Sequence, residues 1–285
     1  MPELPFLEIL AENLAAHVSG RRIDSIEIRQ PALLQSADPP PESFVGEYLS
    51  LPGRVGKYLV LETESRRAIV IHLMRLGRLT VGPGSARATL PKHVSARIRF
   101  DDGSELRLLE HGTEKRARLW FVGEADDLAE LAAVGPDPTR GELTREAFAA
   151  AADSTSRRLK SFLTDQRAIA GIGNGLADEI LFEARLSPLQ LTSNMGAEEG
   201  GRLFEAVGAI LERQITLLRE SAAGKLPQKE PVEHYAVHDH RGAPCPRCGT
   251  AIAWVSYADR DTFYCPGCQT GGHPLKDRRM SKLLK

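Results

Sequence analysis

The chain has 285 residues, of which 42% are hydrophobic and 26% charged, and its formal net charge is −1. This length predicts two or three domains with enough apolar material to form buried cores. No run of about 18 apolar residues occurs, which excludes a transmembrane helix. Because no basic stretch followed by an apolar core marks a signal peptide, we expect a cytoplasmic protein.

The N-terminal residues predict a helix over 4–18. Its apolar side chains recur in steps of three and four, at Leu7, Leu10, Leu14 and Val18, and Gly20 is placed to end it. Pro2 and Pro5 suit the start of a helix. A second interpretation of Pro2 stays open at this point, because its secondary amine would be a nucleophile once Met1 is removed.

Residues 21–125 are expected to form an antiparallel sandwich or barrel. They contain short runs rich in β-branched residues, separated by turn residues and without a helical pattern between them. The predicted strands lie at 22–28, 56–63, 67–74, 95–101 and 104–110. The composition of residues 38–42 (DPPPE) predicts a surface loop, and that of residues 134–143 (VGPDPTRGEL) predicts a linker.

Beyond the linker the pattern becomes helical. The predicted helices lie at 144–152, 157–166, 176–186 and 198–221. A polar stretch at 222–234 is rich in Gly, Lys, Gln and Glu and predicts a mobile loop. The C-terminal region then predicts a hairpin made of the strands 250–257 and 262–268.

All four cysteines lie in this hairpin region, as two CxxC pairs separated by 16 residues: Cys245, Cys248, Cys265 and Cys268. Disulfides are rare in cytoplasmic proteins. Two CxxC pairs at this separation are typical of a tetrahedral structural zinc site, whereas a redox-active thiol pair is the less favoured alternative. We therefore predict one structural Zn²⁺ held by the four thiolates.

The charge distribution points to a polyanionic partner more than the net charge does. Residues 241–285 carry eight Lys or Arg and three Asp, which gives +5, so residues 1–240 carry −6. A basic tail on an acidic body suits a protein that holds a polyanion with one face. Basic C-termini that are only solvated are also common, so this feature alone does not identify the partner.

Three further features indicate a function only in combination. The Gly171–Asn174 turn (GIGN) leads into a predicted helix, where backbone N–H groups and an amide side chain suit phosphate binding. Arg260 lies at the tip of the predicted hairpin, and Lys57 lies at a strand start. Taken singly, each has an ordinary structural explanation: a packing turn, an exposed turn arginine and a surface lysine.

In chain order, these motifs resemble the Fpg/Nei family of DNA glycosylases, which comprises formamidopyrimidine-DNA glycosylase and endonuclease VIII. The matching residues run across the whole chain: Pro2-Glu3-Leu4-Pro5, Gly56-Lys57, His72-Leu73-Met74, Gly77, Leu79, Asp165-Gln166, the Gly171–Asn174 turn, Ala177-Asp178-Glu179, Gly242, Pro244, the four cysteines, Arg260, Tyr264 and Gln269.

The resemblance implies an α+β fold with three parts. An N-terminal antiparallel β-sandwich with an N-terminal helix would form the catalytic domain, at residues 1–134. A helical helix–two-turn–helix (H2TH) DNA-binding domain would follow at 135–235, and a β-hairpin zinc finger at 236–285.

The resemblance also implies a bifunctional DNA glycosylase/AP lyase of base excision repair, a nucleoid-associated monomer that acts on damaged double-stranded DNA. Pro2 would attack C1′ and form a Schiff base, and β,δ-elimination would then release both phosphates. Glu3 would be the general acid at O4′. Lys57, Asn174 and Arg260 would hold phosphates around the lesion, and Lys57 and Arg260 would thereby contribute to catalysis.

Two departures from the family pattern bear on the choice of lesion. Phe6 stands where the family commonly has a first glutamate after Pro-Glu-Leu-Pro, while Glu8 matches the second. Met74 and Arg75 are candidates for filling the gap left by the flipped nucleotide. The Arg-Arg-Phe stretch found in many formamidopyrimidine-type members is missing from residues 110–120 (EHGTEKRARLW).

These departures keep a second function open, namely a lesion- or abasic-site-binding protein of the same fold with weak or AP-lyase-only activity. A zinc-finger DNA-binding module without repair activity is a third alternative, which Pro2 and Glu3 disfavour. A CxxC thiol oxidoreductase is a fourth, which the zinc-type spacing disfavours. Residues 221–233 fall where some family members carry a base-capping loop, but their sequence does not say which base it covers.

Overall fold

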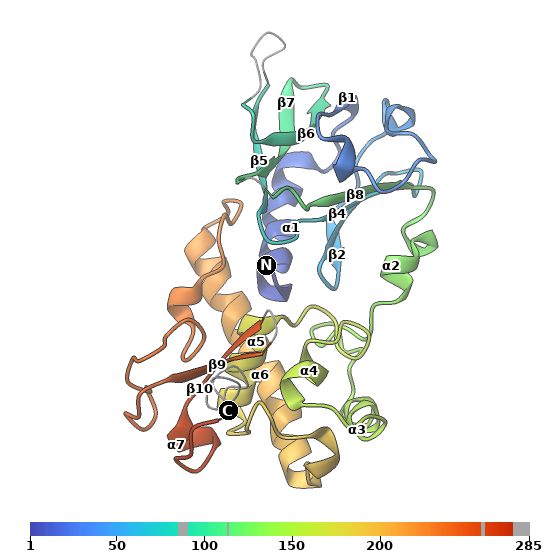
Figure 1. Cartoon of the computed structure of the whole chain (residues 1–285). Coiled ribbons are helices and arrows are strands. Elements are labelled where there is room, and N and C mark those ends of the chain that lie inside the picture. Colours follow the sequence, from blue (N-terminus) through green and yellow to red (C-terminus); the bar gives the residue numbers. More distant parts are fainter. Residues whose placement is uncertain (85–90, 113, 258–259, 276–285) are drawn as a thin grey trace, which may run out of the picture. The chain divides into compact units, whose positions relative to one another are not determined.

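A computed structural model describes residues 1–84, 91–112, 114–257 and 260–275 (Figure 1). The chain divides into two compact units. The first unit comprises Met1–Ala133 and Leu218–Glu230, and the second comprises Val134–Leu217 and Pro231–Lys285. The three-domain boundaries expected from the sequence stay predictions.

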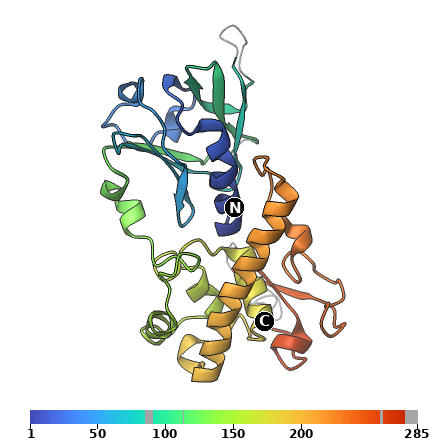
Figure 2. The ribbon, with the colours of Figure 1, turned by 180° about the vertical axis from the view of Figure 1, so that it is seen from behind.

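The first unit consists of helix α1 (Leu4–Val18) and two four-stranded antiparallel sheets (Figures 1 and 2). One sheet has the order β1 (Ile23–Ile28), β6 (Val94–Phe100), β7 (Ser104–Glu110) and β5 (Gly77–Pro83). The other has the order β2 (Gly53–Val55), β3 (Tyr58–Glu62), β4 (Ala68–His72) and β8 (Arg118–Val122). Short helices lie at α2 (Ala129–Ala132), Pro31–Leu33, Pro41–Phe44 and Ala125–Asp127.

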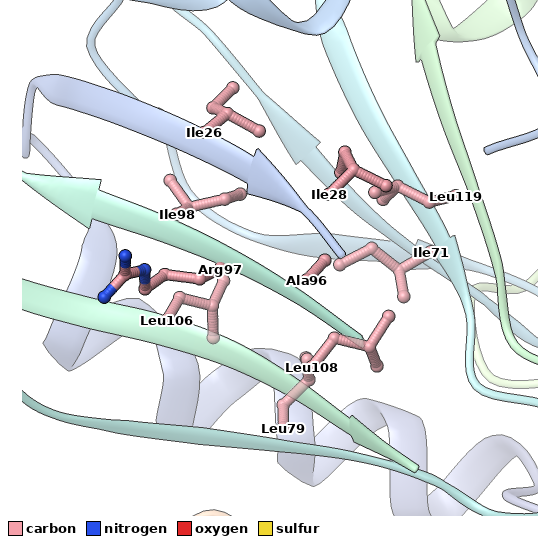
Figure 3. Close-up of a pocket in the computed structure, with 10 residues that line it drawn as sticks. All are labelled: Ile26, Ile28, Ile71, Leu79, Ala96, Arg97, Ile98, Leu106, Leu108 and Leu119. Carbon is pink, nitrogen blue, oxygen red and sulfur yellow. The ribbon is translucent and has the colours of Figure 1, made fainter. Parts of the chain in front are cut away.

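The two sheets bury a shared apolar layer. Aliphatic side chains from both sheets surround a cavity of about 20 Å³, among them Ile26, Ile98, Leu108, Ile71 and Leu119 (Figure 3). The lining is aliphatic apart from Arg97, and a space of this size is residual packing volume. The cavity therefore belongs to the core and is not a ligand site.

Helix α1 has the predicted bounds, and it packs against β2 and β3. The four apolar residues that predicted it, Leu7, Leu10, Leu14 and Val18, are all fully buried. A proline occupies the first helical turn, and Gly20 follows with a φ of +71°, a conformation that favours glycine. Both ends of the helix are thus fixed by the residues expected to fix them.

The five predicted strands are confirmed as β1, β3, β4, β6 and β7. The three strands that the sequence did not indicate, β2, β5 and β8, all lie at sheet edges. β2 is only three residues long, and β5 (GRLTVGP) contains two Gly and a Pro, which an edge strand tolerates, so both give weak local signals. β8 (RLWFV) buries four consecutive apolar residues, so its edge position does not explain why it was missed.

The second unit contains the helices α3 (Arg145–Asp153), α4 (Leu159–Leu163), α5 (Asn174–Glu183) and α6 (Ala197–Ala222), short 3-10 turns at Thr192–Asn194 and Val232–His234, the hairpin β9 (Ala253–Tyr257) and β10 (Arg260–Tyr264), and α7 (Pro266–Gln269). Strand β10 lies beside α5 (Figure 1). The last turn of α6 and the residues that follow it belong to the first unit. The predicted mixed fold, with an N-terminal helix, sheets, a helical region and a cysteine-bearing hairpin, is confirmed.

None of the helices in the described ranges is both long and apolar enough to cross a bilayer.

Candidate functional site

Pro2 and Glu3 lie buried at the start of α1. Glu3 is the N-cap residue, with extended backbone, and its carbonyl accepts a hydrogen bond from the N–H of Leu7 at 3.1 Å. Its own N–H points elsewhere and donates to Oε1 of Glu230 at 2.7 Å. The candidate nucleophile and the candidate acid therefore share their surroundings with a third residue from far along the chain.

Glu230 is the last residue of the segment 218–230. This segment is hydrogen-bonded to the rest of the first unit. The side chain of Asn13 donates to the carbonyl of Lys225 at 2.8 Å, and that of Gln228 donates to the carbonyl of Leu79 at 3.0 Å. Arg78 donates to the carbonyl of Gln228. Part of the stretch at 222–234, whose polar composition predicted a mobile loop, is thus hydrogen-bonded to α1 and β5.

Charged groups of both signs lie near Glu230 and affect its pKa. Burial and the nearby Glu3 carboxylate raise the pKa of Glu230 to about 8, against the lowering effects of the Glu3 N–H, the N-terminal amine and Arg78. Burial in turn lowers the pKa of Arg78, whose guanidinium lies 6.0 Å above the ring of Phe6. Sequence reasoning missed both Glu230 and Arg78, because no local pattern marks a residue whose partners lie in another part of the chain.

Lys57 lies in the two-residue turn between β2 and β3 and is only 6% exposed. Gly56 precedes it with a φ of +54°, as a tight hairpin of this kind requires. The hairpin is tied to α1 by a 2.5 Å ion pair between the fully buried Arg54 and Glu8. A lysine held this way is a fixed buried cation, unlike the solvated surface lysine that its position alone suggested.

His72 lies close enough to Lys57 to feel its charge. Burial, Lys57 and Arg118 together lower the pKa of His72 to about 4. The imidazole is therefore neutral near pH 7, and its Nδ1 accepts a hydrogen bond from the N–H of Met74 at 3.1 Å. A neutral histidine beside a buried lysine leaves the positive charge of the site on the lysine.

Met74 and Arg75 lie in the turn between β4 and β5. Met74 has a φ of +51°, which a non-glycine side chain rarely adopts, and the bond to His72 holds it there. Arg75 is exposed. Gly77 closes the turn, since a Cβ at this residue would lie 2.5 Å from the carbonyl oxygen of Leu73.

In the second unit, Asn174 is the first residue of α5. The turn before it is built on Gly171, with a φ of +80°, and on Gln166. The Gln166 side chain accepts from the N–H of Gly171 at 3.0 Å and donates to the carbonyl of Ile172 at 2.8 Å. A cavity of about 110 Å³ opens beside Asn174, and its lining includes Arg158, Lys160 and Thr262. Arg158, an amide and a helix N-terminus around one cavity suit an anionic group, while the charge of Lys160 is balanced by Asp178.

A buried carboxylate joins α5 to β10. Asp178 accepts hydrogen bonds from Nζ of Lys160 at 2.7 Å, Nδ1 of His238 at 2.8 Å and the N–H of Phe263 at 3.2 Å. Lys160 also donates to the carbonyl of Asp261 at 2.7 Å. This network fixes the strand that begins at Arg260, whose backbone pairs with Tyr257.

The four cysteine Sγ atoms all lie within 4.8 Å of one another. The Sγ atom of Cys248 lies 3.4 Å from that of Cys265 and 3.5 Å from that of Cys268, and Cys245 and Cys268 are 3.9 Å apart. A disulfide requires about 2.05 Å, so these thiols are free. Four sulfurs placed tetrahedrally about 2.3 Å from a zinc ion are about 3.8 Å apart. The cluster therefore fits one Zn²⁺, as predicted.

The candidate residues divide between the units. Pro2, Glu3, Lys57, Met74 and Arg75 belong to the first unit, and Asn174, Arg260 and the four cysteines belong to the second.

Comparison with known proteins yields matches along most of the chain. Residues 1–112 match a family model for the formamidopyrimidine-DNA glycosylase N-terminal domain, residues 134–223 one for the formamidopyrimidine-DNA glycosylase H2TH domain, and residues 242–271 one for a zinc finger found in FPG and IleRS.

Curated relatives include formamidopyrimidine-DNA glycosylases from Roseiflexus sp. (strain RS-1) and Chloroflexus aurantiacus. Each is 34% identical and aligns with 94% of this chain, covering 100% and 98% of the relative, respectively. Similar solved structures include MutM in complex with DNA containing carbocyclic 8-oxo-G, with a TM-score of 0.84 at 24% identity. Another is Lactococcus lactis Fpg in complex with Fapy-dG-containing DNA, with a TM-score of 0.84 at 25% identity. Both cover 94% of this chain and 100% of the solved chain.

Proposed function

Because the chain belongs to the formamidopyrimidine-DNA glycosylase family, we propose that it is a bifunctional DNA glycosylase/AP lyase of base excision repair. It removes an oxidised base from double-stranded DNA and then cleaves the abasic site. The observation that carries this proposal is the buried Pro2-Glu3 pair at the start of α1, in a chain that matches the family along most of its length.

Pro2 is the proposed nucleophile, once Met1 has been removed. An α-amino group has a reference pKa of about 8, so a useful fraction is uncharged near neutral pH. Its attack on C1′ expels the base, and a secondary amine then gives an iminium ion that is cationic at every pH. This cation withdraws electrons and drives loss of the 3′ and then the 5′ phosphate. Glu3 donates the proton that O4′ needs when the sugar ring opens.

Cationic side chains and a helix N-terminus hold the DNA backbone in this proposal. Lys57 and Arg260 grip phosphates beside the extruded nucleotide, and Asn174 binds a phosphate at the cavity lined by Arg158 and Lys160. The buried position of Lys57 supports such a role, because a desolvated cation interacts more strongly with an anion than a solvated one does. With chromosomal DNA as substrate, the protein would act at the nucleoid.

The four cysteines would hold one Zn²⁺, whose chemistry here is structural: it stiffens a hairpin with a small apolar core of its own. Thiolate side chains at all four positions leave no open coordination position for a reacting water. Stoichiometric zinc in the purified protein would test this.

The solved relatives suggest which class of lesion the protein recognises, and residues of this chain suggest how the space of the extruded nucleotide is filled. The solved relatives were captured with 8-oxo-G, Fapy-dG and abasic DNA, which suggests oxidised purines and abasic sites. Met74 and Arg75 are proposed to occupy the space of the extruded nucleotide from their turn, with Met74 already held in a rare backbone conformation. The missing Arg-Arg-Phe stretch favours, as a second candidate, a lesion-binding protein with weak or AP-lyase-only activity.

Borohydride trapping on an abasic duplex tests the proposal. The processed protein should form a covalent adduct, and protein still blocked ahead of Pro2 should not. Pro2→Gly should trap more slowly and still react, because it keeps a terminal amine but gives a poorer iminium. Absence of an adduct with the processed protein would refute the lyase. A panel of duplexes with 8-oxoguanine, FapyG, 5-hydroxycytosine or thymine glycol separates full glycosylase activity from the second candidate.

A further inference from the structure

We propose that Glu230 is the proton acceptor for the Pro2 amine, so that the segment 218–230 completes the surroundings of the nucleophile. This inference rests on the proposed function and assigns a further residue to the same reaction. It starts from an acidic side chain placed at the N-terminus by packing over 227 residues of sequence.

The geometry brings the carboxylate to the reacting nitrogen. Oε1 of Glu230 lies 2.7 Å from the backbone nitrogen of Glu3. The nitrogen of Pro2 is three covalent bonds from that atom, less than about 4.3 Å away, so the acceptor lies within about 7 Å of the nucleophile. Oε2 has no hydrogen-bond partner among the described residues. Removal of Met1 turns the amide nitrogen of Pro2 into an amine that lies within this distance of the carboxylate.

The acidic residues at the N-terminal end of the chain are not suited to accept the proton of the Pro2 amine. The first turn of the helix contains no acidic residue, because Phe6 fills its buried position. Glu8 is committed to the buried Arg54. Glu3 carries the proton destined for O4′ in the proposed mechanism. A separate acceptor must therefore come from outside α1, and Glu230 is the carboxylate that lies there.

The electrostatic surroundings of Glu230 suit a proton acceptor for an amine. The charged groups that face Glu230 are the Glu3 carboxylate, the N-terminal amine and Arg78. Burial and Glu3 raise the pKa of Glu230 to about 8, which is close to the reference value of an α-amino group. A proton moves between two groups of similar pKa at little cost in free energy, whereas an ordinary glutamate, near 4.3, would be a poor base toward an amine.

The proton and electron movements balance. The prolinium nitrogen gives one proton to Glu230, and its lone pair forms the bond to C1′ while the bond from C1′ to the base breaks with its electron pair on the base. The proline nitrogen gives its second proton to the departing base. Opening of the sugar then breaks the C1′–O4′ bond, O4′ takes a proton from Glu3, and the nitrogen lone pair forms the iminium.

The test is the pH dependence of single-turnover borohydride trapping on an abasic duplex, comparing Glu230→Gln with the processed wild type. We expect Glu230→Gln to trap several-fold more slowly between pH 7 and 8, where Glu230 begins to ionise while part of an amine with a pKa of about 8 still carries its proton. The deficit should close toward pH 9.5, where most of an amine with a pKa of about 8 is already free. Glu230→Asp should retain much of the rate. Glu220→Gln, at an exposed position of the same unit, is the matched control and should behave as wild type.

A second variant keeps the test sharp if Glu230→Gln folds poorly. Arg78→Gln removes a cation that lowers the pKa of Glu230, so the rising limb of its pH profile should move to higher pH. A deficit of Glu230→Gln that is the same at every pH, or no deficit, would overturn the inference, as would an unmoved limb in Arg78→Gln. Failure of the wild type to form an adduct would instead refute the proposed function.

Discussion

Asp178 is a buried carboxylate that joins α5 to β10 in the second unit. It is fully buried, and its carboxylate accepts from Lys160, His238 and the N–H of Phe263. Asp178→Ala would leave the ammonium of Lys160, itself 8% exposed, without its counter-charge. It would also leave the amide of Phe263 in β10 without its acceptor.

Breaking a buried ion pair by removal of one partner typically costs about 3–5 kcal/mol, because the remaining charge stays desolvated. We expect a loss in this range from the free energy of unfolding of the second unit. Asp178→Asn, which keeps a neutral acceptor, should cost less, about 1–3 kcal/mol. The double variant Asp178→Leu with Lys160→Met should recover part of the loss, since it removes both charges together.

Urea unfolding, followed by tryptophan fluorescence, measures the free energy of unfolding of each variant. The chain has two tryptophans, so a Trp120→Phe background reports on Trp254 in β9 alone, in the second unit. All variants are compared in that background with saturating zinc, because metal binding shifts apparent stability. A cost of Asp178→Ala below about 1 kcal/mol, or a double variant that equals the sum of the single ones, would refute the reasoning.

Three further predictions concern DNA binding, the metal and pH. Arg260→Ala should weaken binding to lesion DNA and reduce the slope of log K against log salt by about 0.9, the share of one phosphate contact; an unmoved slope would remove Arg260 from the interface. Chelation of zinc should unfold the hairpin of the four cysteines and abolish DNA binding, and added Zn²⁺ should restore binding. Full DNA binding by the metal-free protein would contradict the structural role of the metal. The folded pKa of His72, about 4, lies below its unfolded value of about 6.5, so the unfolded state binds more protons between these pH values. Stability of the first unit should therefore fall as pH drops from about 6.5 to 4, by at most about 1.4 kcal/mol per pH unit for this group, and His72→Gln should lack that contribution.

Local sequence signals were sufficient where the structure depends on neighbours in the chain. The steps of three and four in residues 4–18 gave a helix with the same bounds in the structure. The spacing of the cysteines gave a cluster with zinc-like separations, because each CxxC turn fixes two thiols by itself. The inner strands and the edge strand β1 were found, whereas β2 and β5 were missed because a three-residue strand and one containing two Gly and a Pro carry little hydrophobic pattern.

The sequence by itself therefore determined the helix at the N-terminus, the inner strands, the metal ligands and, through ordered motifs, the family and the candidate roles of Pro2, Glu3 and Lys57. Only the tertiary structure decided what surrounds them: the burial of Lys57, the anchoring of its hairpin, the polar contacts of the segment 218–230 and the approach of Glu230 to Glu3. The physical reason is sequence separation. A hydrogen bond that closes over 227 residues is set by the packing of whole elements, and no periodicity, cap or spacing near either residue records it.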